Sequence, residues 1–191
     1  PYTTKEYDGK EYYYENKGYD IESYNMINEY LSGIKKTNMA LHKLVDYFDK
    51  EDEPVIIIFF GDHNPSLGDN AFAYHDLGIN ISFETIDGFL NYYETPFVIH
   101  ANDEAKKIFN NSFVGDGGKI SPIFIMNLVF NNMNLKGNQY LQYMNDLRNK
   151  VDVINKTYYK EDGNFIRVSE SKYEKLIEEY KMINYYQLTN N

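Results

Sequence analysis

Cysteine is absent from the 191 residues of this sequence. Its absence excludes disulfide bonds, zinc sites made of thiolates and cysteine nucleophiles. A metal site or a covalent mechanism in this chain must therefore use other side chains. The absence is compatible with an exported bacterial protein and equally with a cytosolic one.

Long hydrophobic runs are also missing. The longest apolar run, residues 55–60, has the length of a strand, and no window approaches the roughly 18 apolar residues of a membrane-spanning helix. The chain opens on Pro-Tyr-Thr-Thr-Lys, without the basic start and apolar segment of a signal peptide. We therefore expect a segment of a longer protein, with no membrane span or signal peptide of its own.

Positive charge is in short supply, since 29 acidic residues outnumber 19 basic ones and the net charge is -10. Binding to nucleic acids or to anionic lipid headgroups depends on Lys and Arg, so we expect neither kind of partner for the chain itself. An acidic protein that acts on phosphate esters needs a metal cation to make its pocket attractive to anions.

The pattern of apolar residues predicts one α/β domain over residues 1–191. Apolar positions three or four apart predict a helix over residues 22–50, with a bend or break allowed at Gly33. The β-branched run at residues 55–60 is typical of a parallel strand buried on both faces. A long helix that leads into such a strand forms half of a βαβ unit.

Further elements follow with shorter signals. They are a long loop with short elements at 64–94, a strand at 96–100, helices at 103–109, 121–132 and 139–149, a hairpin at 158–168, and a last helix from about 171 to 183. Ser121 before Pro122 predicts a capped helix start, and Asp162-Gly163 predicts the hairpin turn. The fold predicted is a mostly parallel sheet flanked by helices, with a small C-terminal hairpin plus helix.

Gly61, Asp62 and His63 follow the apolar strand directly. In open α/β sheets, ligands bind beyond the carboxyl ends of the strands, so both side chains are expected to project into a binding crevice. A carboxylate beside an imidazole suits Zn²⁺ or Mn²⁺. The alternative is that Asp62 is an ordinary turn residue and that His63 lies in solvent.

Other histidines are weaker candidates. His75 lies in the long loop after the pair, and His100 ends the second predicted strand, so either could contact a substrate. His42 borders the apolar stripe of the first helix and is expected to be solvated or packed. The glycines at 115–118 lack the Lys-Ser/Thr of a phosphate-binding loop and predict a turn.

Residues 30–68 resemble the sulfatase-type catalytic domain of the lipoteichoic acid synthase and phosphoglycerol transferase family, within the alkaline phosphatase superfamily. The matching motifs are Tyr30-Leu31, Ala40-Leu41, Asp52-Glu53-Pro54, and Gly61-Asp62-His63-Asn64-Pro65-Ser66-Leu67-Gly68. A later match is Tyr93-Glu94-Thr95-Pro96-Phe97, and Pro1-Tyr2 resembles the end of the family's His-Gly-Pro-Tyr loop. Asn38 and His100 depart from the residues usual in the family.

The resemblance implies a partial alkaline-phosphatase-like sandwich in which Asp62 and His63 bind one divalent metal. Mn²⁺ is the favoured ion, with Mg²⁺ and Zn²⁺ as alternatives. The family's nucleophilic Thr, a Glu ligand and a substrate-contacting His would all precede Pro1, so this segment alone is expected to be inactive.

For the longer protein the resemblance implies a metal-dependent phosphoglycerol transferase, or a related phospho- or sulfo-ester transferase or sulfatase. It would act on an anionic lipid or polymer of the cell envelope, at the extracellular face of a membrane held by upstream helices. Its direct partner would be the N-terminal part of its own catalytic domain. The alternative hypothesis is a non-catalytic domain that binds a cell-wall polymer through surfaces lined by some of its 20 tyrosines.

Overall fold

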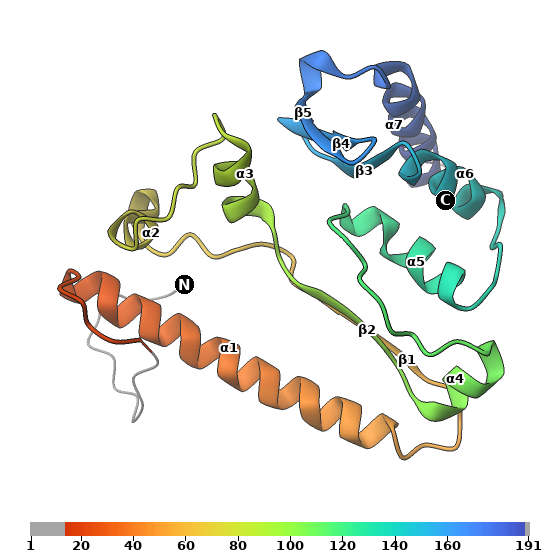
Figure 1. Ribbon diagram of the computed structural model, residues 1–191, viewed down its shortest axis with the longest axis horizontal. Coiled ribbons are helices and arrows are strands. Elements are labelled where there is room, and N and C mark those ends of the chain that lie inside the picture. Colours follow the sequence, from red (N-terminus) through yellow and green to blue (C-terminus); the bar gives the residue numbers. More distant parts are fainter. Residues whose placement is uncertain (1–13, 190–191) are drawn as a thin grey trace. The chain divides into compact units, whose positions relative to one another are not determined.

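The computed structural model describes residues 14–189, which form helices and short strands (Figure 1). The α/β class predicted from the sequence is confirmed. The chain divides between Ile108 and Phe109 into two compact units, and we describe each by itself. The organisation as one domain stays a prediction, and Pro1-Tyr2 lies outside the described residues.

The first unit begins with the long helix α1 (Ile21–Phe48). Asp20 caps it, because the Asp20 Oδ1 atom accepts a hydrogen bond of 2.9 Å from the backbone N–H of Glu22. The helix continues through Gly33 without a break. None of the helices in residues 14–189 has the length and apolarity needed to cross a bilayer.

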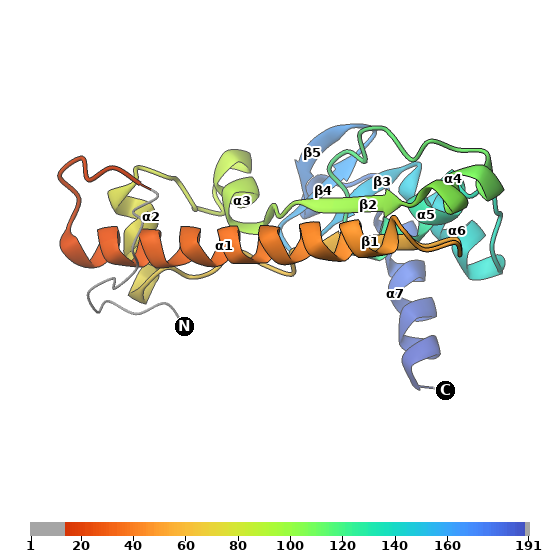
Figure 2. The same ribbon diagram turned by 90° about the horizontal axis from the view of Figure 1, so that it is seen from below.

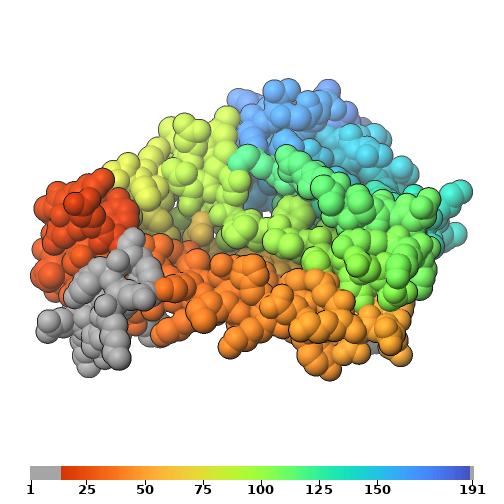
Figure 3. Space-filling model, turned by 60° about the horizontal axis from the view of Figure 1, so that its bottom comes forward, coloured from red at the N-terminus to blue at the C-terminus, as the bar shows by residue number. Residues whose placement is uncertain are grey.

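Only the first part of α1 is buried. Met26 and Ile27 pack with Leu67 and Ala73, which belong to the segment that contains η1 (Asp69–Ala71) and α2 (Phe72–Asp76). Farther along α1 some apolar side chains are half-buried and others are exposed, such as Leu44 with an exposed fraction of 44%. In the space-filling view this part of α1 (orange) is uncovered (Figure 3).

Two strands of the first unit, β1 (Ile56–Phe60) and β2 (Phe97–Ala101), form an antiparallel pair. Ile56 lies opposite Ala101, and Phe60 lies opposite Phe97. This direction differs from the predicted parallel pairing, and every strand pair in the described part of the chain is antiparallel. Residues 61–96, which include α3 (Ile86–Tyr93), return the chain to the end of β1, so β2 must start where β1 stops.

Burial of β1 also differs from the prediction. Its first four residues are half-buried and Phe60 is 49% exposed, whereas a strand buried on both faces was expected. An apolar, β-branched run reports a preference for extended backbone and for burial, and it carries no information about strand direction.

Asn102 holds the far end of this strand pair together, and its side chain is buried. Its Oδ1 atom accepts hydrogen bonds of 3.0 Å from the N–H groups of Val55 and of Ala105. Its Nδ2 atom donates to the carbonyl oxygens of Phe48 at 3.1 Å and of Glu53 at 2.8 Å. One side chain thus joins the end of α1, the start of β1 and the start of α4 (Asp103–Phe109).

The second unit combines helices with a three-stranded antiparallel sheet of order β3-β4-β5 (Figure 2). Its elements are η2 (Pro122–Phe124), α5 (Ile125–Asn132), α6 (Gln139–Arg148), β3 (Val151–Ile154), β4 (Tyr158–Glu161), β5 (Asn164–Arg167), η3 (Val168–Glu170) and α7 (Glu174–Thr189). The predicted hairpin is confirmed, with Asp162 and Gly163 at φ of 46° and 83° in its turn. Strand β3 was not predicted, and α7 begins and ends later than predicted.

Ser121 behaves differently from the expected helix cap. It does precede η2, but its side chain makes no capping hydrogen bond. Its Oγ atom instead accepts a hydrogen bond of 2.8 Å from the N–H of Ile154, and its own N–H donates to Asp152. The serine therefore joins the start of this helical segment to β3.

Candidate functional site

The turn that follows β1 is held against the start of β2. The N–H of Gly61 donates to the carbonyl of Pro96 at 3.1 Å, and the Thr95 hydroxyl donates to the carbonyl of Gly61 at 2.7 Å. A Cβ atom at position 61 would lie 2.8 Å from the Thr95 Cβ atom. Glycine is therefore required here because the two chain segments approach closely.

The rest of the turn is anchored at three more points. The Asn64 amide donates to the carbonyl oxygens of Asn91, Tyr92 and Glu94, at the carboxyl end of α3. The Tyr74 hydroxyl donates to the carbonyl of Pro65 at 2.8 Å. Leu67 is buried in the cluster with Met26 and Ile27. The backbone around Asp62 and His63 is thus fixed, while their own side chains are 84% and 75% exposed.

Asp62 and His63 point toward one another. Asp62 Oδ2 lies 3.6 Å from His63 Nε2, and Asp62 Oδ1 accepts a hydrogen bond of 2.9 Å from the His63 N–H. Two ligands about 2.1 Å from one tetrahedral metal ion lie about 3.4 Å apart, so this separation fits a shared ion. That the two side chains bind a metal stays a prediction.

The surroundings of the His63 ring favour the neutral tautomer that a metal ligand needs. Its Nδ1 atom lies 3.0 Å from the carbonyl oxygen of Asn64. A carbonyl oxygen can only accept, so this contact requires a proton on Nδ1, and in the neutral ring the lone pair is then on Nε2. A backbone carbonyl that orients the other ring nitrogen is the usual support of a metal-binding histidine.

The pair alone is an incomplete coordination shell. Among residues 14–189 no group of three or more His, Asp or Glu side chains is placed to hold a metal ion. A divalent ion takes four or more ligands in a protein site. Asp62 and His63 therefore fit a metal as two of its ligands, and the remaining positions must be filled by other groups.

The structure does not bring the other histidines to this pair. His100 lies opposite Ile57, near the other end of the strand pair, and its Nε2 atom is 2.7 Å from Asp49 Oδ1. Asp62 lies five positions after Ile57, and five steps of extended chain span about 16 Å. His75 is exposed on α2, and His42 is exposed on α1, as expected for a solvated histidine. We do not include His100 in the site.

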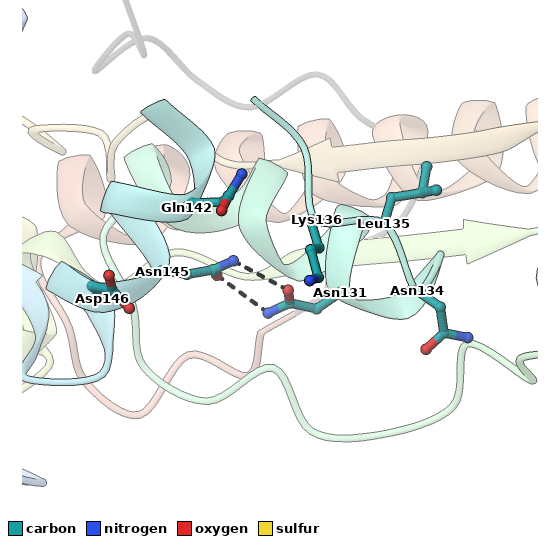
Figure 4. A pocket seen from close by; sticks show the side chains of 7 residues that line it. All are labelled: Asn131, Asn134, Leu135, Lys136, Gln142, Asn145 and Asp146. Carbon is teal, nitrogen blue, oxygen red and sulfur yellow. Dashed lines mark hydrogen bonds between the residues drawn. The ribbon is translucent and has the colours of Figure 1, made fainter. Parts of the chain in front are cut away.

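A separate pocket of about 430 Å³ lies within the second unit (Figure 4). Its lining residues are Asn131, Asn134, Leu135, Lys136, Gln142, Asn145 and Asp146. The amides of Asn131 and Asn145 face each other, and each donates to the other at 3.3 Å. The pocket offers mainly hydrogen-bonding groups and contains none of the residues predicted for the site.

Sequence reasoning did not assign the residues that support the turn. Asn64, Tyr74 and Thr95 have no reactive chemistry of their own, and each acts by holding backbone near Asp62 and His63. A signal for Asn64 and Thr95 was present, because both lie inside the motifs that carry the resemblance. Tyr74 had no such signal.

A family model described as Sulfatase matches residues 1–133 of this chain. The phosphoethanolamine transferase EptA of Helicobacter pylori is 29% identical over 83 residues, which are 44% of this chain and 15% of that protein. The chain thus matches a small part of this curated relative's length. No solved structure was found to match the chain.

Proposed function

The chain belongs to the sulfatase family, and from this premise we propose that Asp62 and His63 are metal ligands in a site that processes phosphate or sulfate esters. Domains of this family, within the alkaline phosphatase superfamily, generally use a divalent metal. The observation that carries the proposal is the 3.6 Å separation of Asp62 Oδ2 and His63 Nε2, on a turn that is anchored on both sides. A divalent ion there would neutralise charge on the oxygens of the transferred group.

Mn²⁺, the ion that the family resemblance implies, is the proposed ion, with Zn²⁺ and Mg²⁺ as alternatives, and the donor set is compatible with it. One carboxylate oxygen and one imidazole nitrogen suit borderline divalent metals better than the all-oxygen sites of Ca²⁺. Thiolate ligands are excluded, because the sequence has no cysteine. Asp62 and His63 would hold the ion, and the Asn64 hydrogen bonds would fix the position of their turn relative to α3.

The proposed reaction is transfer of phosphoglycerol or a related phosphoryl group, such as phosphoethanolamine, to a cell-envelope acceptor. The motifs of residues 30–68 support phosphoglycerol transfer, and the H. pylori relative, named a phosphoethanolamine transferase, supports the related group. His75, exposed on the segment after the pair, stays a proposed contact to the anionic lipid or polymer substrate. We propose that the reaction takes place at the extracellular face of the cell membrane.

We also propose that the nucleophile and the missing ligands come from an N-terminal part of the same catalytic domain. Two observations support this partner. The described residues contribute two clustered ligands, and apolar side chains such as Ile34 and Leu44 stay exposed along α1. On this proposal the 191-residue chain alone has no transferase or hydrolase activity.

The test is ester turnover by the full-length protein with Mn²⁺, comparing Asp62→Ala and His63→Ala with the exposed control Asp46→Ala. Loss of a metal ligand is expected to lower turnover by about 100-fold or more, since even changes to groups that only support the ligands cost 10–100-fold. Asp46→Ala is expected to stay within about two-fold of the wild type. Undiminished turnover in Asp62→Ala would overturn the proposal.

A further inference from the structure

Three exposed aromatic rings meet at the end of α3, and we call them the aromatic triangle: Phe83, Tyr92 and Tyr93. The ring centroids of Phe83 and Tyr92 are 4.9 Å apart, those of Phe83 and Tyr93 are 5.5 Å apart, and those of Tyr92 and Tyr93 are 4.9 Å apart. The exposed fractions of the three residues are 38%, 42% and 43%. Each ring touches the other two and still presents surface to solvent.

The aromatic triangle is built rigidly. Tyr93 packs on the buried ring of Phe89, one helical turn earlier, with centroids 5.1 Å apart. The segment that carries Phe83 is clamped to α3, because a Cβ atom at Gly88 would lie 2.1 Å from the carbonyl oxygen of Ser82. Thr85 caps α3 by accepting from the Gly88 N–H at 3.1 Å. Rings that are already ordered lose little entropy when a ligand binds.

The same helix end is joined to the proposed metal ligands. Asn64, the residue after His63, donates its side-chain hydrogen bonds to the carbonyl oxygens of Asn91, Tyr92 and Glu94. The backbone of Tyr92, which carries one ring of the triangle, is therefore held by Asn64, the residue after the proposed ligand His63. Helix α3 ends at Tyr93, shortly before β2 begins, and β2 begins where β1 stops, so the triangle and the Asp62–His63 turn both adjoin this end of the strand pair (Figure 1).

The charge of the segment and helix that carry the triangle favours some of the ligands that stack on aromatic rings over others. Glu84, Asp87 and Glu94 are exposed carboxylates on the same segment and helix. Carboxylates repel the phosphates of nucleic acids and of anionic lipid headgroups. They accept hydrogen bonds from hydroxyl groups, and the Tyr hydroxyls can both donate and accept. A neutral sugar ring, with an apolar C–H face and hydroxyls at its rim, fits this combination.

We propose that the aromatic triangle is a subsite for a neutral pyranose ring of the substrate or acceptor. Its place next to a catalytic centre rests on the proposed function, whereas sugar binding by the triangle does not. The sugar would lie flat on one of the two exposed tyrosine rings, because the Tyr92 and Tyr93 rings are inclined by 74° to each other. Its hydroxyls would meet the carboxylates of the same segment and helix. The subsite would thus position a glycan relative to the Asp62–His63 pair.

Isothermal titration calorimetry of the 191-residue chain with tri-N-acetylchitotriose and with maltotriose tests the subsite. We expect a Kd in the millimolar range for at least one of them, and a weakening of about 10-fold or more in Tyr92→Leu and Tyr93→Leu. The leucine variants keep apolar volume and remove the ring, and circular dichroism checks that they fold. Tyr185→Leu, at a 70% exposed tyrosine on α7, is the matched control and should bind like the wild type.

Two further arms separate the outcomes. Asp62→Ala should bind the sugars unchanged, so a failure of the proposed metal site leaves this result intact. Vesicles of phosphatidylglycerol should not bind the chain. Three results would each overturn the proposal. They are no binding of either sugar at concentrations up to about 10 mM, sugar binding by the Tyr92 and Tyr93 variants equal to that of the wild type, and vesicle binding that those variants remove.

Discussion

At the scale of single residues, Gly61 decides how the candidate site is built. A glycine after the strand lets the backbone turn there without a clash at Cβ. The structure adds a second reason, since a Cβ atom at position 61 would lie 2.8 Å from the Thr95 Cβ atom. The Thr95 hydroxyl also donates a hydrogen bond to the Gly61 carbonyl. The close approach of residues 61 and 95 places the Asp62–His63 turn against the start of β2.

Gly61→Ala is expected to destabilise the chain by about 1–3 kcal/mol, because the added methyl group must displace Thr95 or the backbone. Gly33→Ala is the control, since nothing lies within 4 Å of a Cβ atom there and the position is inside α1. That change is expected to stabilise by about 0.5–1 kcal/mol. Urea denaturation measures both, and a Gly61→Ala chain as stable as the wild type would show that the close approach is not needed.

At the scale of elements, α1 extends beyond the part of the first unit on which it packs. The apolar stripe that predicts this helix includes Ile27, Ile34 and Leu44, yet only Ile27 is buried in the described residues. Ile34 is 49% exposed and Leu44 is 44% exposed. On the proposed function, the N-terminal part of the catalytic domain packs on this stretch of α1.

Leu44→Glu is therefore expected to act differently in two settings. In the 191-residue chain it should change the free energy of unfolding by less than about 1 kcal/mol, as exposed substitutions do. In the full-length protein it should bury an unpaired carboxylate and abolish most ester turnover. Lys43→Glu, at the exposed neighbouring position, should be silent in both. Full turnover in full-length Leu44→Glu would argue against a partner on this face.

At the scale of the whole molecule, the described residues supply two adjacent proposed ligands and no cluster of three or more such side chains. Metal affinity grows with the number of ligands that a protein holds in place. A pair that is 84% and 75% exposed, with solvent in the remaining positions, is a weak site. The full-length protein, with further ligands, should be a stronger one.

The 191-residue chain is expected to bind Mn²⁺ with a Kd above about 0.1 mM, the range of weak extracellular metal modules. Calorimetric titration with MnCl₂ measures it, and His63→Ala should remove the binding that is present. The control is His42→Ala, an exposed histidine on α1, which should leave it unchanged. A Kd below about 10 µM would contradict the prediction and would indicate that this chain holds further ligands.

Local features of the sequence were enough to identify the long helix, both apolar strands of the first unit, the Asp162-Gly163 turn and the Asp62–His63 pair. Each depends on residues close together in the chain, through the period of apolar side chains, the φ values that a turn needs, or the adjacency of two side chains. The structure agrees with the helix, strand and turn assignments, and Asp62 and His63 do face each other.

Contacts between distant residues were decided by the tertiary structure alone. The antiparallel direction of β1 and β2, the pairing of His100 with Asp49, and the use of Ser121 by β3 all depend on the path of the chain between those residues. The aromatic triangle likewise needs the fold of residues 80–93 to bring Phe83 onto Tyr92 and Tyr93. The pattern of apolar residues indicates which segments favour burial. Only the folded path of the chain determines which other segment each one packs against.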